Sequence, residues 1–150
     1  MHDVTKDWFE NENGLCKLCQ VGEETAMHLF AECNMVKDFW VWLYPKIELE
    51  WQASGLNVFL NSYGTINDFQ FYCMAVAKHT VWTVRNKCVF DNVHASTNLI
   101  RKVFIEQIQS ELRILLRVHK RKNRREMFRE RYIKYAIVCD IEDETITVPW

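Results

Sequence analysis

The chain has 150 residues, of which 49% are hydrophobic and 26% are charged, and its formal net charge is −1. This is the length and balance of one globular domain, so an intrinsically disordered or low-complexity protein is excluded. With 6 Trp and 9 Phe against 4 Gly and 2 Pro, the composition favours a mainly α-helical fold over a many-turned β architecture. We expect a single domain over residues 1–150.

The near-neutral total conceals a strong segregation of charge. Residues 1–60 carry 4 Lys or Arg against 10 Asp or Glu, whereas residues 101–134 carry 12 against 4. Residues 135–150 are acidic again, with 4 Asp or Glu and no Lys or Arg. This pattern indicates either an anionic partner for the basic block or internal pairing between the acidic and basic segments.

The sequence also bears on the compartment. No stretch approaches the roughly 18 consecutive apolar residues that a bilayer span requires, and the acidic N-terminus has no signal-peptide pattern. We therefore expect a soluble intracellular protein, nuclear or cytoplasmic, without a membrane partner. In a reducing compartment, the 6 Cys are expected to be metal ligands or buried thiols rather than disulfides.

Three cysteines and one histidine follow the spacing of a metal site. Cys16, Cys19, His28 and Cys33 read Cys-x2-Cys-x8-His-x4-Cys. Thiolate and imidazole are ligands that Zn²⁺ prefers, and four protein ligands close a tetrahedral site. The sequence therefore predicts one structural Zn²⁺ in a knuckle over residues 14–34. The alternative interpretation is three core cysteines and an incidental histidine.

The residues between the ligands predict how the knuckle folds. Gly22 is expected to support the turn, and the acidic residues before Thr25 are expected to begin a short helix that carries His28. His28 and Cys33 are five positions apart, which places them about 140° apart around a helix. The helix must therefore end before Cys33 if both residues are to bind one ion.

A longer motif surrounds the four ligands. It comprises Cys16 and Cys19, Glu24-Thr25, His28-Leu29-Phe30, Cys33 and Phe39-Trp40, and a second stretch has Trp82, Arg85-Asn86 and Phe90. The first stretch resembles the zinc-binding domain C-terminal to the reverse transcriptase of non-LTR (LINE-type) retrotransposons. The second is similar to a signature that often follows the zinc cluster in related elements. The resemblance covers residues 16–42 and, with a less specific motif, residues 82–90.

This resemblance implies a non-enzymatic zinc-binding module that assists RNA or DNA binding in a parent polypeptide whose reverse transcriptase domain lies upstream. The chain itself contains no Gly-rich phosphate loop, no His-Glu-x-x-His, no Gly-x-Ser-x-Gly and no aromatic-x-Asp-Asp. We therefore expect no enzymatic activity in this chain.

Three or four amphipathic helices are expected over residues 35–139. The first would be capped by Asn34 and limited by Pro45, and residues 46–64 read as a connection that residues 58–60 anchor. The second would begin at a capping box of Thr65 and Asp68.

The third helix is expected to be capped by Ser96, Thr97 or Asn98 and to continue into the basic segment, with a break near Asn123. After it, residues 140–150 read as an acidic tail, in which Thr145 to Val148 alternate like a short strand or an extended end.

The segment from Arg113 to Lys134 holds ten Lys or Arg, with aromatic residues nearby. Positive side chains bind phosphates, and aromatic rings stack on unpaired bases. The candidate nucleic-acid contacts are Arg117, Lys120, Arg121, Lys122, Arg124, Arg125 and Arg129. The alternative is a solvated helix face whose charges pair with the acidic first sixty residues, with the aromatic residues in the core. The protein would then be a zinc-stabilised structural or protein-interaction domain without nucleic-acid affinity.

Overall fold

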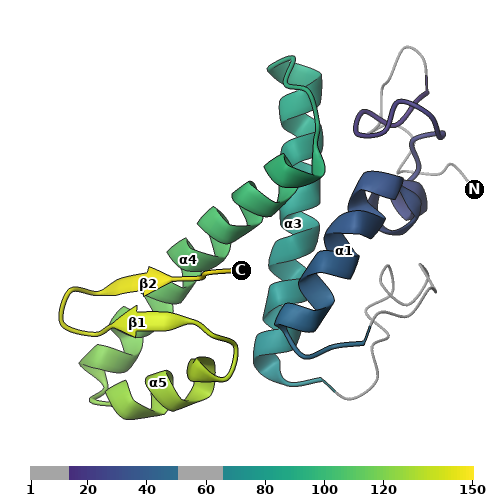
Figure 1. Ribbon diagram of the computed structural model, residues 1–150. Helices are drawn as coiled ribbons and strands as arrows, with labels where there is room; N and C mark the ends of the chain where they lie inside the picture. Colours follow the sequence, from purple (N-terminus) through teal and green to yellow (C-terminus); the bar gives the residue numbers. More distant parts are fainter. Residues whose placement is uncertain (1–13, 51–65) are drawn as a thin grey trace, which may run out of the picture.

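The computed structural model describes residues 14–50 and 66–150, and this part of the chain is mainly helical, as predicted. Its elements are the π-helix η2 (His28–Glu32), the α-helices α1 (Asn34–Lys46), α3 (Asp68–Phe90), α4 (Thr97–Arg121) and α5 (Arg125–Ile133), and the strands β1 (Val138–Asp140) and β2 (Thr145–Thr147). Figure 1 shows α1 beside α3, while α4 starts near the end of α3 and diverges from it toward α5 and the strands. The predicted Cys3His cluster lies at the N-terminal end of this arrangement.

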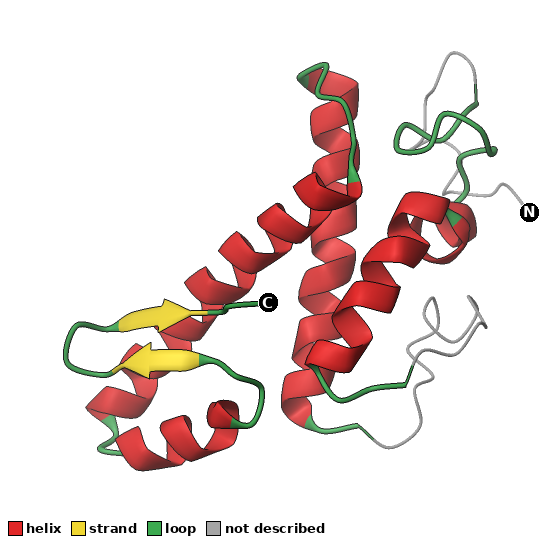
Figure 2. Cartoon of the chain, viewed as in Figure 1, coloured by secondary structure: helices red, strands yellow, loops and turns green. Residues whose placement is uncertain are grey.

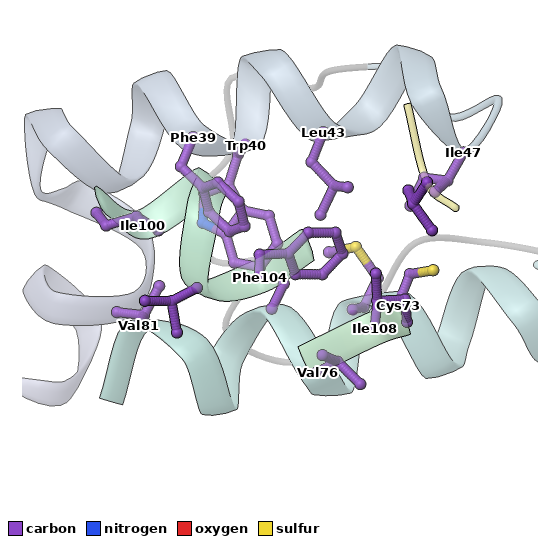
Figure 3. Close-up of a cluster of buried hydrophobic side chains, with 14 of the residues drawn as sticks. Phe39, Trp40, Leu43, Ile47, Cys73, Val76, Val81, Ile100, Phe104 and Ile108 are labelled. Atoms are coloured by element: carbon purple, nitrogen blue, oxygen red, sulfur yellow. The ribbon is translucent and has the colours of Figure 1, made fainter. Parts of the chain in front are cut away.

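The core lies where α1, α3 and α4 meet. Phe39, Trp40 and Leu43 of α1 face Ile100 and Phe104 of α4, and residues of α3 close the cluster from the other side (Figure 3). The rings of Phe39 and Phe104 meet edge to face, with their centroids 5.5 Å apart. Leu43 lies four positions after Phe39 and three after Trp40 along α1, as on one buried face of an amphipathic helix.

Hydrogen bonds from backbone N–H groups to side chains mark where α3 and α4 begin. Of the three predicted cap residues, Ser96 caps α4, since its Oγ accepts from the backbone N–H of Leu99 at 3.0 Å. In α3 the capping box is formed by Asn67 and Gln70, each side chain accepting from the other's backbone N–H at 2.9 Å. The predicted box of Thr65 and Asp68 is therefore wrong: Asp68 is the first residue of α3, and residue 65 lies outside the described residues.

The bounds of α1 and the end of α4 can also be compared with the predictions from the sequence. Asn34 is the first residue of α1 and does not cap it through its side chain, whereas Pro45 lies in the last turn, as expected. The predicted break near Asn123 is present, because Asn123 has a φ of 55° between the end of α4 and the start of α5. Asparagine tolerates this left-handed conformation better than most residues. The predicted connection over 46–64 and its anchor at 58–60 lie largely outside the described residues.

The C-terminal residues form a packed hairpin instead of the expected acidic tail, and the short strand predicted from the alternation of Thr145 to Val148 is present as β2 (Thr145–Thr147). The chain leaves helical structure after Ile133, before residue 139, and β1 and β2 form an antiparallel hairpin in which Cys139 pairs with Ile146 (Figure 2). Ile146 and Val148 are buried, and the indole N–H of Trp150 donates to the carbonyl of Tyr135 at 2.8 Å. These buried residues hold the segment against α4, so the acidic residues nearby did not reveal its structure.

Among the described residues, no helix combines the length and the apolarity needed to cross a membrane.

Candidate metal centre

The four predicted ligands come together in the folded chain. The ligand atoms of Cys16, Cys19, His28 and Cys33 all lie within 4.8 Å of one another. The Sγ atoms of Cys16 and Cys33 are 4.0 Å apart, and Cys19 Sγ is 3.3 Å from Nε2 of His28. In a tetrahedral zinc site, bond lengths of about 2.0–2.3 Å place the ligand atoms about 3.5–3.8 Å from one another. The cluster could therefore hold a metal ion after small adjustments.

A tight loop, in which the chain reverses direction between Leu15 and Glu23, positions the first two cysteines. Leu15 and Glu23 form an antiparallel bridge, and the N–H of Cys16 donates to the carbonyl of Gly22 at 2.7 Å. Between them, Gln20 has a φ of 61° and donates its N–H to the carbonyl of Cys16 at 2.8 Å. Thus Gln20, and not Gly22, takes the left-handed turn conformation that the sequence assigned to a glycine.

Gly22 serves the site in another way. A Cβ built on it would lie 2.4 Å from Cε1 and 2.8 Å from Nδ1 of His28. The imidazole ring therefore packs directly on the α-carbon of Gly22. Any side chain at this position would push the ring away from the three sulfurs.

A short helical turn presents His28 and then stops. The backbone N–H of His28 donates to Oγ1 of Thr25 at 3.0 Å, and the turn widens into the π-helix η2. The N–H of Cys33 donates to the carbonyl of His28 at 2.7 Å, after which Cys33 leaves helical geometry with a ψ of 128°. The helix thus ends before Cys33, as predicted, and the two ligands face one point.

The site is partly shielded from water. Cys16 and Cys33 are fully buried, while Cys19 and His28 are partly exposed. The hydrogen bond between the two buried thiols raises the pKa of Cys16 and lowers the pKa of Cys33. Thiols bind a metal ion as thiolates, so a bound ion would displace the thiol protons. Because the protein supplies all four ligands, such a site is structural and has no open position for an activated water.

A buried ion pair fastens the knuckle to α3. Glu24 Oε1 accepts from Nη2 of Arg85 at 2.6 Å and from its Nε at 3.0 Å. The other carboxylate oxygen of Glu24 accepts from the backbone N–H of Lys17 at 2.8 Å, inside the Cys16-x2-Cys19 turn. The two side chains are only 5% and 1% exposed. Sequence reasoning missed this pair, although the two residues stand in the two stretches that carry the family resemblance.

The aromatic pair of the motif is structural. Trp40 donates its indole N–H to the carbonyl of Phe30 at 2.9 Å, which ties α1 to η2. Phe39 is fully buried in the core between α1 and α4. Trp40 therefore ties the knuckle to α1, Phe39 packs α1 against α4, and neither buried ring forms a binding surface.

Four of the seven predicted nucleic-acid contacts form ion pairs within the chain. Arg117 and Lys120 both bind Glu144, at 2.9 and 3.3 Å, and the other two pairs are Arg125 with Glu142 and Arg129 with Glu126. Pairing within the chain therefore occurs, but three of the four cations pair with the C-terminal hairpin. The predicted partner was the acidic first sixty residues, and of these the described residues 14–50 form no ion pair with the four cations.

The remaining three candidates lie together where α4 meets α5. Arg121, Lys122 and Arg124 are exposed and form no ion pair in the part of the chain that the structure describes. We call these three residues the basic turn. The aromatic rings expected to stack on bases are instead core residues, since Phe128 and Tyr132 pack on each other with centroids 4.6 Å apart.

The buried Cys3His cluster, its ion pair with α3 and the basic turn are thus the features through which the chain could bind a metal ion or a partner. Comparison of the chain with protein-family models, with curated proteins and with solved structures finds no match.

Proposed function

We propose that the protein is a zinc-stabilised, non-enzymatic module that binds single-stranded RNA or DNA through the basic turn. The observation that carries this proposal is the exposure of Arg121, Lys122 and Arg124, without ion-pair partners in the described chain, at the end of a 25-residue helix. A metal ion at the opposite end of the fold would stabilise the knuckle on which α1 and α3 pack.

The donor set favours zinc over other common ions. Three thiolates are soft ligands and imidazole is a borderline one, whereas Ca²⁺ and Mg²⁺ require oxygen ligands. A cluster of three cysteines and one histidine is the donor set of structural zinc sites.

The contacts would be made to the phosphate backbone. The aromatic side chains of α5 are buried, so the basic turn offers charge without stacking platforms. Phosphate contacts alone give binding that depends strongly on salt and little on sequence. Three neutralised phosphates correspond to a slope of about −2 in a plot of log affinity against log salt for a single strand.

The family resemblance supplies the biological setting. In a parent polypeptide with an upstream reverse transcriptase domain, this module would hold RNA or DNA beside the polymerase. The contact between Glu24 and Arg85 supports treating the two stretches that carry the resemblance as one unit, because it joins them by a buried ion pair.

The test is a titration of labelled single-stranded RNA with zinc-loaded protein at several salt concentrations. The triple variant Arg121→Gln, Lys122→Gln, Arg124→Gln should lose most of the affinity and flatten the salt slope by about 2. A matched control, Lys37→Gln, Lys46→Gln, Lys87→Gln, removes the same charge from exposed positions on α1 and α3 and should retain binding. Absence of binding at low salt, or equal loss in both variants, contradicts the proposal.

A second candidate is a structural or protein-interaction domain without nucleic-acid affinity. The observation that favours it is the pairing of Arg117, Lys120 and Arg125 with the C-terminal hairpin, which neutralises part of the basic block. It predicts that wild-type protein fails to bind RNA in the same titration, even at low salt.

A further inference from the structure

We propose that Arg117, Lys120 and Arg121 form a phosphate subsite that the carboxylate of Glu144 occupies in the free protein, and that a backbone phosphate displaces this carboxylate when nucleic acid binds. This inference rests on the proposed function and adds a second contact region beside the basic turn.

The geometry of α4 supplies the three cations. Arg117 and Arg121 are four positions apart and Lys120 lies between them, so the three side chains share one face of the last turns of the helix. They line a cavity of about 500 Å³, and the fourth residue at its wall is Glu144. This face of α4 therefore gathers three cations around a space large enough to admit an oxyanion group.

Glu144 shows that the cavity accepts an oxyanion. Its Oε2 accepts from Nε of Arg117 at 2.9 Å, and its Oε1 accepts from Nζ of Lys120 at 3.3 Å. A phosphodiester offers the same features, namely one negative charge and two oxygens able to accept from a guanidinium and an ammonium group. The Arg117 guanidinium and then the Lys120 ammonium hold the pKa of Glu144 below its ordinary value, so the resident group is a carboxylate at neutral pH.

The hairpin turn positions the Glu144 side chain through a backbone conformation that is uncommon for glutamate. Glu144 has a φ of 53°, a left-handed conformation that favours Gly or Asn in hairpin turns. Asp140 fixes the turn, because its Oδ1 accepts from the backbone N–H groups of Glu142 and Asp143 at 3.0 and 3.1 Å. A glutamate at the left-handed position therefore places a charge over α4 that the usual turn residues would not provide.

Displacement needs little rearrangement. The side chain of Glu144 is 33% exposed and that of Arg117 is 56% exposed, so the pair already lies at the surface. An exposed pair of this kind is weak. An incoming phosphate replaces the negative charge that the Glu144 carboxylate had placed beside the cations, and the Glu144 side chain turns toward solvent. The carboxylate thus acts as an internal competitor that lowers the affinity for nucleic acid.

The test compares two neutralising variants of equal charge. Glu144→Gln removes the competitor, whereas Glu126→Gln removes a carboxylate that pairs only locally with Arg129 within α5 among the described residues. With a labelled 12-nucleotide oligouridine as probe, Glu144→Gln should tighten binding by about threefold more than Glu126→Gln, the size expected for release of an exposed pair. The salt slope should also steepen, since two more cations become available to phosphates.

A double-mutant cycle keeps the result independent of small changes in stability. In the background of Arg117→Gln with Lys120→Gln, the advantage of Glu144→Gln over wild type should disappear. Equal tightening by Glu144→Gln and Glu126→Gln, or an advantage that survives in this background, overturns the subsite.

If the oligouridine binds and the basic-turn variant weakens it, the proposed function still stands after such a result. If neither wild type nor Glu144→Gln binds at low salt, both proposals are overturned.

Discussion

The imidazole ring of His28 packs on the α-carbon of Gly22 so closely that a Cβ at Gly22 would lie 2.4 Å from Cε1 of the ring. The glycine is therefore needed for space at a metal ligand. A ring that moves by the width of a methyl group can no longer share one ion with three sulfurs at bond lengths of about 2.0–2.3 Å.

Gly22→Ala should accordingly weaken zinc binding by more than about tenfold, since bond distances in zinc sites vary by only about 0.2 Å. Competition with a chromogenic chelator measures this loss. Gly14→Ala is the matched control: Gly14 has a φ of 65° with open space around its α-carbon, so the same methyl adds backbone strain without touching a ligand. Equal zinc affinity in Gly22→Ala and wild type would show that His28 is not a ligand.

The ligand set itself predicts a stoichiometry. Wild-type protein should bind one zinc ion, and Cys16→Ser or Cys33→Ser should lose it and unfold the knuckle, because structural zinc contributes on the order of 10 kcal/mol in isolated fingers. Cys73→Ser is the control, since Cys73 is fully buried in the helical core and lies outside the cluster. Zinc content by mass spectrometry of the native protein gives the count. One full equivalent retained by Cys33→Ser means that the ligands are wrongly assigned.

The metal centre was predictable where its chemistry is local in sequence. The four ligands lie within eighteen residues, so their spacing alone indicates a metal site. The requirement that the helix end before Cys33 follows from helical geometry. The ion pair of Glu24 with Arg85 joins residues 61 positions apart, and no local pattern specifies such a contact. The role of Gly22 was likewise hidden, because a glycine beside a turn suggests backbone freedom before it suggests close packing.

The ion pair leads to a prediction about stability. Arg85→Met leaves the carboxylate of Glu24 buried without its guanidinium partner, and removing one partner of a buried pair costs about 3–5 kcal/mol of unfolding free energy. Urea unfolding of the zinc-loaded protein measures the loss. Replacing both partners, with Glu24→Leu and Arg85→Met together, should recover part of it, since no charge then remains buried.

A matched exposed pair provides the control for that measurement. Lys102 and Glu106 form an ion pair on α4 with side chains 73% and 62% exposed. Lys102→Met should change the unfolding free energy by less than about 0.5 kcal/mol, as expected for a surface pair within one helix. If Arg85→Met costs no more than Lys102→Met, the knuckle and α3 are not coupled through Glu24.

The helices were easier to predict than the C-terminal hairpin, for a physical reason. The apolar faces of α1, α3 and α4 repeat over many turns, so periodicity alone locates them. Each strand of the hairpin has three residues and only one inward position, which is partly buried in β1 and buried in β2, and the pairing partner lies on the other strand. Acidic residues dominate the composition there and suggested a solvated tail, while the few apolar residues determine the structure.

A pair of substitutions in β2 separates a packed hairpin from a solvated tail. Ile146 is 2% exposed against α4, whereas Thr147, the next residue on the same strand, points to solvent. Ile146→Ala should cost about 2–4 kcal/mol of unfolding free energy through lost burial and the cavity left behind, and Thr147→Ala less than about 0.5 kcal/mol. Chemical denaturation followed by tryptophan fluorescence measures both, because Trp150 stacks on Phe104 of α4 with centroids 6.3 Å apart. Equally small effects of the two substitutions mean that residues 140–150 contribute no packing, and Glu144 would then have no fixed position over Arg117.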